Sequence, residues 1–147
     1  MKYNKLKEIG RKKRNFERLC TVLIIALLAL AVLGMVALEL DYYTKPLLLE
    51  GFGVLVLLGV VLFLVFNSKQ SKYSRMAEDY IIIKIMDLIN ENGIDTSNIE
   101  IIQEVDYRYR VGFHNQTVDY EDLQSKIDSE LDTMNKIAGK SIRVKLI

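Results

Sequence analysis

The fold class is decided by residues 19–38, LCTVLIIALLALAVLGMVAL, because this stretch carries no charged side chain over the length of a membrane span. A helix of about 20 apolar residues crosses the hydrocarbon core of a bilayer. Residues 47–66, LLLEGFGVLVLLGVVLFLVF, have a single charge, Glu50, in their first turn. Pro46 suits the first helical position, where a missing N–H costs no hydrogen bond. Only residues 39–46 separate the two stretches, so the sequence predicts an antiparallel transmembrane hairpin with an outer loop.

A cleaved secretory signal peptide is the alternative interpretation of the first stretch, because a basic segment precedes it. Signal peptides have a shorter apolar region followed by a small-residue cleavage site. The first stretch is longer, and no A-x-A motif follows it. A retained membrane span is therefore favoured.

Charged residues are segregated into blocks, although the formal net charge of the 147-residue chain is only +1. Residues 1–18 carry a net +6, residues 39–50 a net −2, residues 67–75 a net +3 and residues 76–147 a net −6. Basic flanks mark the cytoplasmic side of a span, so the blocks predict a multi-pass protein of the cell (inner or plasma) membrane with both termini cytoplasmic. Nucleic-acid capture is the alternative for the basic run at 11–14. The residues predicted to set topology or contact anionic headgroups are Lys7, Arg11, Lys12, Lys13, Arg14, Arg18, Lys69, Lys72 and Arg75.

Small residues predict where the two spans pack, because membrane helices associate through small side chains. The predicted packing residues are Ala26, Ala29, Gly34, Ala37, Gly51 and Gly59. Neither span has an ionisable residue near its middle, which disfavours ion or proton transport by this chain. Cys20 is interpreted as an inert apolar residue, with palmitoylation as the alternative.

Residues 76–147 predict a small cytoplasmic α+β domain. The preceding residues 67–75 are polar and form either a linker or a helical extension of the second span. Apolar residues follow helical spacing over 75–92. Alternation with period two over 99–113 predicts two strands, with a turn near 104–107.

A second helix and a closing strand complete this predicted domain. Asp119 is a good N-cap and Gly139 a good C-cap, and residues 142–146 alternate between apolar and basic side chains. The predicted order is α-β-β-α-β, in which the helices cover one face of a three-stranded sheet. The predicted buried face of the second helix consists of Leu123, Ile127, Leu131, Met134 and Ala138.

The sequence contains no enzyme signature. Gly139-Lys140-Ser141 matches the end of a phosphate-binding loop, but Met134 stands where that loop needs its first glycine, and a helix precedes the segment where the loop would follow a strand. The only histidine, His114, and the only cysteine, Cys20, fall in different parts of the chain, so no Cys–His pair or metal site is expected. We expect no catalytic residue, no metal and no cofactor.

Basic side chains in the predicted strands are the candidate partner contacts: Arg108, Arg110, Arg143 and Lys145. For the first two, pairing with acidic residues of the preceding strand is the favoured interpretation and ligand binding the alternative. The alternating aromatic residues Tyr107, Tyr109 and Phe113 are similar to a base-stacking platform. The net charge of −6 instead favours a packed inner face and disfavours direct binding of nucleic acid.

The layout of two spans followed by helix, strands, helix and strand resembles the N-terminal region of membrane-anchored DNA translocases of the FtsK/SpoIIIE kind, including conjugative coupling ATPases. The local similarity lies in Ala138-Gly139-Lys140-Ser141-Ile142-Arg143-Val144, which is similar to the helix-to-strand junction before the motor of that family. In layout the resemblance covers residues 19–147. The family's ATPase core would follow the last strand, where this sequence stops at Ile147. The resemblance therefore implies an anchoring and assembly segment without motor activity.

Two hypotheses follow for the function. The first is a membrane-anchored assembly protein whose acidic domain binds a protein or oligomerises, in a DNA-translocation, conjugation or secretion apparatus. The second is a membrane-embedded sensor or effector whose domain binds a small ligand and alters the packing of the hairpin. A small domain with an open sheet edge favours the first. The expected partners are the bilayer, with its anionic inner leaflet, and a second copy or other subunits of a membrane complex.

Overall fold

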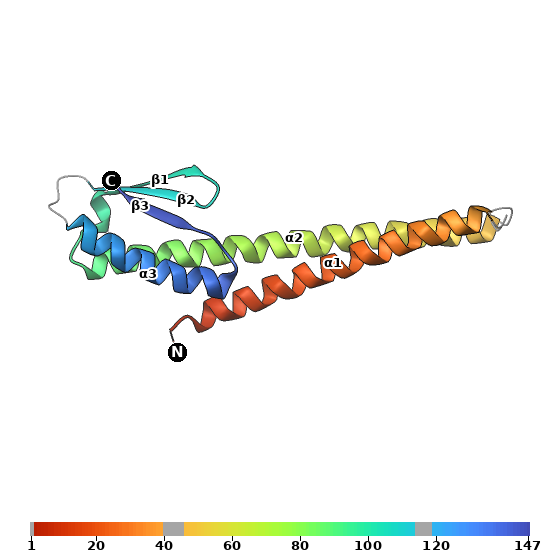
Figure 1. The fold of residues 1–147 in the computed structure, drawn as a ribbon, viewed down its shortest axis with the longest axis horizontal. Coiled ribbons are helices and arrows are strands. Elements are labelled where there is room, and N and C mark those ends of the chain that lie inside the picture. The colour runs from red at the N-terminus through yellow and green to blue at the C-terminus, as the bar shows by residue number, and fades with distance from the viewer. Residues whose placement is uncertain (1, 40–45, 114–118) are drawn as a thin grey trace. The chain divides into compact units, whose positions relative to one another are not determined.

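The computed structural model describes residues 2–39, 46–113 and 119–147 (Figure 1). The chain divides into two compact units. We call Met1–Arg11 together with Ser74–Ile147 the α+β unit, and Lys12–Tyr73 the helical-pair unit. The middle of the predicted outer loop, residues 40–45, and His114 lie outside the described residues.

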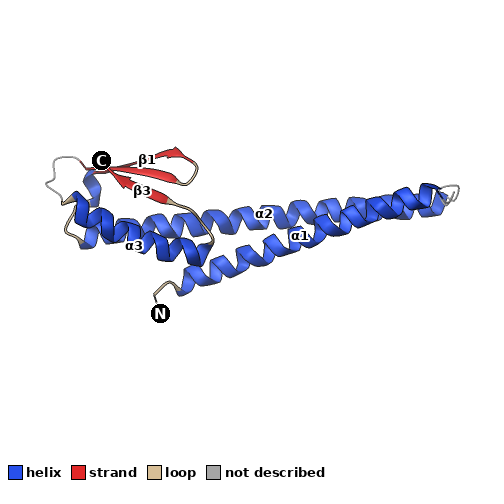
Figure 2. Cartoon of the chain, in the orientation of Figure 1, coloured by secondary structure: helices blue, strands red, loops and turns tan. Residues whose placement is uncertain are grey.

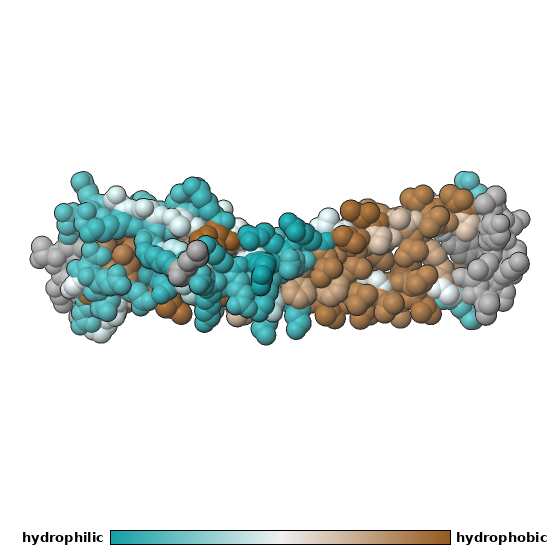
Figure 3. Space-filling model, turned by 90° about the horizontal axis from the view of Figure 1, so that it is seen from below, coloured by the Kyte–Doolittle hydropathy of each residue, from teal (hydrophilic) through white to brown (hydrophobic). Residues whose placement is uncertain are grey.

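Two long helices form the helical-pair unit and continue into the α+β unit (Figure 2). α1 spans Asn4–Glu39, and α2 spans Pro46–Glu91, beginning at the predicted proline. Both helices are long and apolar enough to cross a membrane. Large apolar side chains face outward, with Leu28 63% and Leu57 66% exposed, and Figure 3 shows this apolar surface in brown. Such a surface is typical of helices that contact lipid.

Packing between α1 and α2 uses only some of the predicted small residues. A Cβ atom added at Gly59 would stand 2.8 Å from Leu27 Cδ2, so this glycine permits close approach of the helices. Gly34 is buried and Ala37 is half-buried. Three predicted packing residues instead face open space or are exposed: Ala26, Ala29 and Gly51. Two helices in contact bury only a narrow stripe of each, and these three residues lie outside it, so for them the prediction of intrachain packing is wrong.

The segment 67–75 is helical, because α2 continues through it without interruption to Glu91. No Gly or Pro occurs in this segment to break the helix. The helical-extension interpretation is therefore confirmed and the linker is wrong. The helix predicted from residue 75 onward is the C-terminal part of α2, and it ends close to the predicted Asn92.

The α+β unit contains a three-stranded sheet with β2 at its centre. β1 (Ile99–Val105) pairs antiparallel with β2 (Arg108–Phe113), and β2 pairs parallel with β3 (Arg143–Leu146). α3 (Tyr120–Ala138) connects the two parallel strands, and a short 3-10 helix, Thr96–Asn98, precedes β1. The observed order agrees with the α-β-β-α-β prediction.

Local sequence signals mark the ends of these elements. The turn between β1 and β2 falls at Asp106 and Tyr107, where it is predicted, and Tyr107 takes a φ of 66°. The Asp119 carboxylate accepts a hydrogen bond from the Asp122 N–H at 3.3 Å and caps the start of α3. Gly139 ends this helix with a φ of 64°, a left-handed conformation that glycine adopts without steric cost.

The core of the α+β unit lies between the helices and one face of the sheet. All five residues of the predicted apolar face of α3 are buried. The buried stripe of α2 repeats every fourth residue: Ala77, Ile81, Ile85 and Ile89. The buried side chains of the sheet are Val111, Val144 and Leu146.

The start of α1 is also part of this core, although residues 1–18 are predicted above only as the basic flank of the first span. The first turns of α1 lie next to the C-terminal end of α3 (Figure 1). Leu6 is 0% exposed and Ile9 is buried. A Cβ atom added at Gly10 would stand 2.7 Å from the carbonyl oxygen of Ile137, so the backbones of the two helices approach closely. The start of α1 is therefore part of the folded core of the α+β unit.

An ion pair adds to this contact between distant parts of the sequence. Lys2 Nζ lies 2.7 Å from Glu130 Oε1 on α3. The basic start of the chain thus meets the acidic helix of the α+β unit. The buried face at the start of α1 can be recognised in the sequence by helical spacing of three or four residues among the lysines. The residues on this face are Tyr3, Leu6, Ile9 and Gly10.

Candidate functional site

One edge of the sheet is closed by two side-chain amides from α3. Gln124 Nε2 donates to the Val144 carbonyl at 2.9 Å, and the Leu146 N–H donates to Gln124 Oε1 at 3.0 Å. Asn135 Nδ2 donates to the Ile142 carbonyl at 2.9 Å, and the Ile142 N–H donates to Asn135 Oδ1 at 3.1 Å. These four bonds occupy backbone groups that would otherwise be free to pair with another strand.

The opposite edge of the sheet, formed by β1, is open within the described part of the chain. β1 pairs only with β2, and every one of its residues after Ile99 is exposed. Ile102 is 46% and Val105 is 62% exposed. An unpaired strand edge that carries exposed β-branched residues is a template for pairing with another chain.

The four candidate partner contacts lie together on the outer face of the sheet, opposite to the buried face that contains Val144. Arg108 is the register partner of Arg143, and Arg110 is the register partner of Lys145. Neighbouring strands are about 4.8 Å apart, so like charges stand directly opposite each other twice. Such pairs destabilise a sheet.

Only one of these cations is neutralised within the described residues. Arg110 forms an ion pair with Glu104 of β1, as the cross-strand interpretation predicts. Arg108 instead stands opposite Val105, so the same interpretation fails for it. Among the residues that the structure describes, the side chains of Arg108, Arg143 and Lys145 make no ion pair or hydrogen bond.

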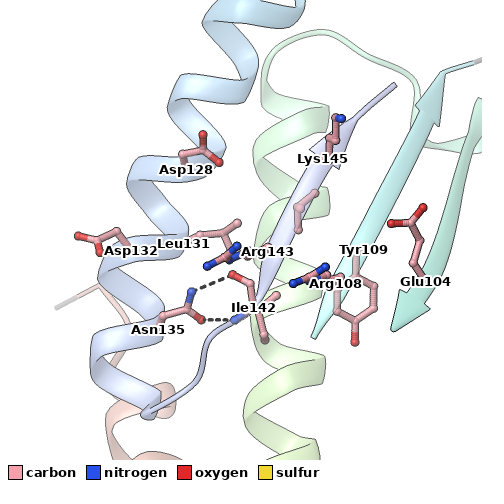
Figure 4. A pocket seen from close by; sticks show the side chains of 11 residues that line it. Glu104, Arg108, Tyr109, Asp128, Leu131, Asp132, Asn135, Ile142, Arg143 and Lys145 are labelled. Atoms are coloured by element: carbon pink, nitrogen blue, oxygen red, sulfur yellow. Dashed lines mark hydrogen bonds between the residues drawn. The ribbon is translucent and has the colours of Figure 1, made fainter. Parts of the chain in front are cut away.

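A pocket of about 580 Å³ lies where β2, β3 and α3 meet (Figure 4). Its charged lining comprises three cations and three carboxylates: Arg108, Arg143, Lys145, Glu104, Asp128 and Asp132. In the view of Figure 4, the guanidinium groups of both arginines lie between Asn135 of α3 and Tyr109 of β2.

The carboxylates of this pocket are all engaged. Glu104 is paired with Arg110, and Asp128 Oδ1 accepts a hydrogen bond of 2.8 Å from Gln124 Nε2. Asp132 Oδ2 lies 2.8 Å from Lys136 Nζ. The pocket therefore contains partnered anions and unpartnered cations, although residues 76–147 as a whole are acidic.

The aromatic side chains of β2 take part in packing. The Tyr109 hydroxyl donates a hydrogen bond to the Glu78 carboxylate of α2. Burial, followed by this hydrogen bond and the negative charge of Glu78, raises the pKa of Tyr109 above its usual value and keeps the hydroxyl protonated. Phe113 is half-buried. Tyr107 stands in the turn, where Lys140 Nζ lies 4.5 Å from its ring centroid. Tyr109 and Phe113 thus fit the packed-face interpretation.

In the helical-pair unit, the basic residues before the first apolar stretch do not all face outward. Lys13 is buried, with its Nζ 3.5 Å from Glu17 Oε1, so assigning it to lipid headgroups is wrong. Lys12 Nζ lies 5.8 Å from the ring centroid of Tyr73, which also stacks on Phe16 at 5.7 Å. The other predicted headgroup contacts are exposed: Lys7, Arg11, Arg14, Arg18, Lys69, Lys72 and Arg75.

The remaining sequence candidates have structural roles. Cys20 is buried as a free thiol, as expected of an apolar position. Gly139-Lys140-Ser141 follows α3 and precedes β3, which is the reverse of the context of a phosphate-binding loop. Within residues 2–39, 46–113 and 119–147, no group of three or more His, Cys, Asp or Glu side chains is placed to hold a metal ion. No protein-family model, no curated protein and no solved structure matches this chain.

Proposed function

We propose that this chain is a non-enzymatic, membrane-anchored assembly protein. Its two apolar helices hold it in the bilayer, and its α+β unit binds another protein. The asymmetry of the sheet carries this proposal, because amides of α3 occupy the β3 edge whereas the β1 edge is open. A fold that shields one edge leaves the other available for a single directed contact.

The partner contributes an extended segment that adds to β1. Pairing of this kind satisfies the free backbone groups of the edge and buries the exposed Ile102 and Val105. The segment comes from another subunit of a membrane complex or from a second copy of the chain. The resemblance to the anchoring region of DNA translocases directs the proposal to a DNA-translocation, conjugation or secretion apparatus.

A photo-crosslinking amino acid at position 102 or 105 is expected to capture this partner in native membranes. Burying an isoleucine contributes about 1.5–3 kcal/mol, so Ile102→Lys should weaken the complex about tenfold or more and reduce the adduct formed from position 105 accordingly. Mass spectrometry of the adduct identifies the partner segment. Ser129, which is exposed on α3, provides the control position.

Two outcomes contradict strand addition at β1. One is recovery of monomer alone from positions 102 and 105. The other is an equal yield of adducts from position 129, which would mean that the captured proteins collide with the surface without binding to β1.

We further infer that both ends of the chain lie in the cytoplasm, on one side of the cell membrane. Leu6 and Leu146 contribute to the core of the same compact unit, so the two ends share one side of any bilayer that α1 and α2 cross. The basic flanks of the spans, including the exposed Lys69 and Lys72, support the cytoplasmic side.

Cysteine labelling tests this topology. A membrane-impermeant maleimide should label Thr44→Cys in intact cells, because residue 44 lies in the predicted outer loop. Ser129→Cys should react only after the cells are permeabilised, and the wild-type chain, whose Cys20 is buried, provides the background. Labelling of position 129 from outside would reverse the inferred orientation.

A further inference from the structure

The pocket between β2, β3 and α3 carries an inference that does not depend on a partner at β1. The carboxylates in its lining form ion pairs or hydrogen bonds with other side chains. Within the described residues, the side chains of the cations Arg108, Arg143 and Lys145 form none. We propose that this pocket binds the phosphoryl group of a small hydroxylated molecule, either free in solution or as the headgroup of a lipid.

The two arginines supply the phosphoryl contact. They are register partners on neighbouring parallel strands, so their side chains leave the sheet about 4.8 Å apart on the same face. A guanidinium presents its N–H groups as a planar fork that matches the oxygen geometry of phosphate. A bound anion also removes the like-charge repulsion between the opposed arginines. Lys145, two residues further along β3 on the same face, adds a third positive charge.

The carboxylates restrict what the rest of the ligand can be. Asp128 and Asp132 line the pocket from α3, and Glu104 lines it from β1. These groups accept hydrogen bonds from hydroxyls but repel additional phosphates. A volume of about 580 Å³ holds more than a bare ion and is within the range of small-molecule sites. The chemistry therefore favours a single phosphoryl group on a small polyol and disfavours a polyanion such as nucleic acid.

Protection of arginines from chemical modification tests this site in the full-length protein. In maltoside micelles, which contain no phosphate, phenylglyoxal is used to modify the arginines in the presence and absence of sn-glycerol 3-phosphate or inorganic phosphate. At about ten times the dissociation constant, only about one tenth of the sites remain free. Modification of Arg108 and Arg143, measured by mass spectrometry, should fall about tenfold. Arg75, which is exposed on α2 in the same unit, should react unchanged.

A lipid arm distinguishes the two sources of the ligand. The same modification is carried out on protein reconstituted in nanodiscs of phosphatidylglycerol and in nanodiscs of phosphatidylcholine, whose headgroup has no hydroxyls. Protection by glycerol phosphate in micelles assigns a soluble ligand. Protection that occurs only in phosphatidylglycerol assigns a lipid headgroup. Either result supports the phosphoryl site.

Two double variants that change the net charge equally distinguish specific binding in the pocket from non-specific attraction of anions to positive charge. For a soluble ligand, Arg108→Gln/Arg143→Gln should abolish binding of radiolabelled glycerol phosphate. For a lipid headgroup, the same variant should abolish the protection of Lys145 from amine acetylation in phosphatidylglycerol nanodiscs. Lys84→Gln/Lys126→Gln changes the net charge equally at helix positions that the pocket does not include, and should preserve both signals. The proposal is overturned if no probe protects the arginines, if Arg75 is protected equally in micelles, or if both double variants lose binding equally. It is also overturned if a DNA oligonucleotide, added to the micelles as a further probe, is the only one that gives protection.

Discussion

Replacing Leu6 by alanine is expected to lower the free energy of unfolding of the α+β unit by about 2–5 kcal/mol, the usual cost of truncating a fully buried leucine. The change leaves a cavity beneath the first turns of α1, next to the end of α3. Hydrogen exchange of the α3 amides in the full-length protein in detergent micelles measures the effect. Because each 1.4 kcal/mol corresponds to about tenfold, protection of these amides should fall about 30-fold or more.

Ile83→Ala provides the matched control for this loss. Ile83 also lies in the α+β unit, on α2, but it is 59% exposed. Its truncation should therefore change the free energy of unfolding by no more than about 0.5 kcal/mol. If Leu6→Ala has an equally small effect, the N-terminal segment does not belong to the core.

Removing both edge amides, in Gln124→Ala/Asn135→Ala, is expected to destabilise the α+β unit by about 2–6 kcal/mol. The reason is the loss of four hydrogen bonds to backbone groups of β3 and of Ile142, the residue that precedes it. Each bond contributes about 0.5–1.5 kcal/mol. The same variant opens the second edge of the sheet. Hydrogen exchange should show the destabilisation at the β3 amides, and sedimentation in detergent should show association that increases with concentration.

A double variant on the solvent side of α3 controls for this experiment. Ser125→Ala/Ser129→Ala introduces two alanines into the same helix at exposed positions, so stability and sedimentation should match those of the wild type. If the amide variant remains monomeric at every concentration, the amides stabilise β3 but do not protect its edge. If its stability is also unchanged, the bonds contribute nothing to the fold.

The elements that follow from short-range patterns agree with the structure. Asp119 and Gly139 mark the two ends of α3 through local backbone chemistry, and the alternation of residues 99–113 is sufficient to place the hairpin and its turn. At 67–75 the sequence leaves a linker and a helical extension open, and α2 continues through the segment because polar composition alone does not end a helix that lacks Gly and Pro. Hydrophobic periodicity therefore identifies helices and strands better than it identifies the segments that connect them.

The features that depend on contacts between distant residues could not be derived in this way. Leu6 is recognisable as apolar, but its burial depends on packing of the start of α1 against residues of the α+β unit that come after Tyr73 in the sequence. Arg108 and Arg143 are candidate contacts because each alternates with apolar neighbours. The fact that they are register partners depends on the parallel pairing across α3, which no local pattern specifies.

The burial of the N-terminal segment in the α+β unit has a consequence for biosynthesis. The ribosome makes Leu6 long before Leu146, so the apolar face of the first turns of α1 stays uncovered until the rest of the α+β unit has been translated. Insertion with one span inverted or missing would strand the two ends on opposite sides of the bilayer, and the core could never close. In a chain whose two helices both cross a bilayer, folding of this small unit thus requires that both have been inserted.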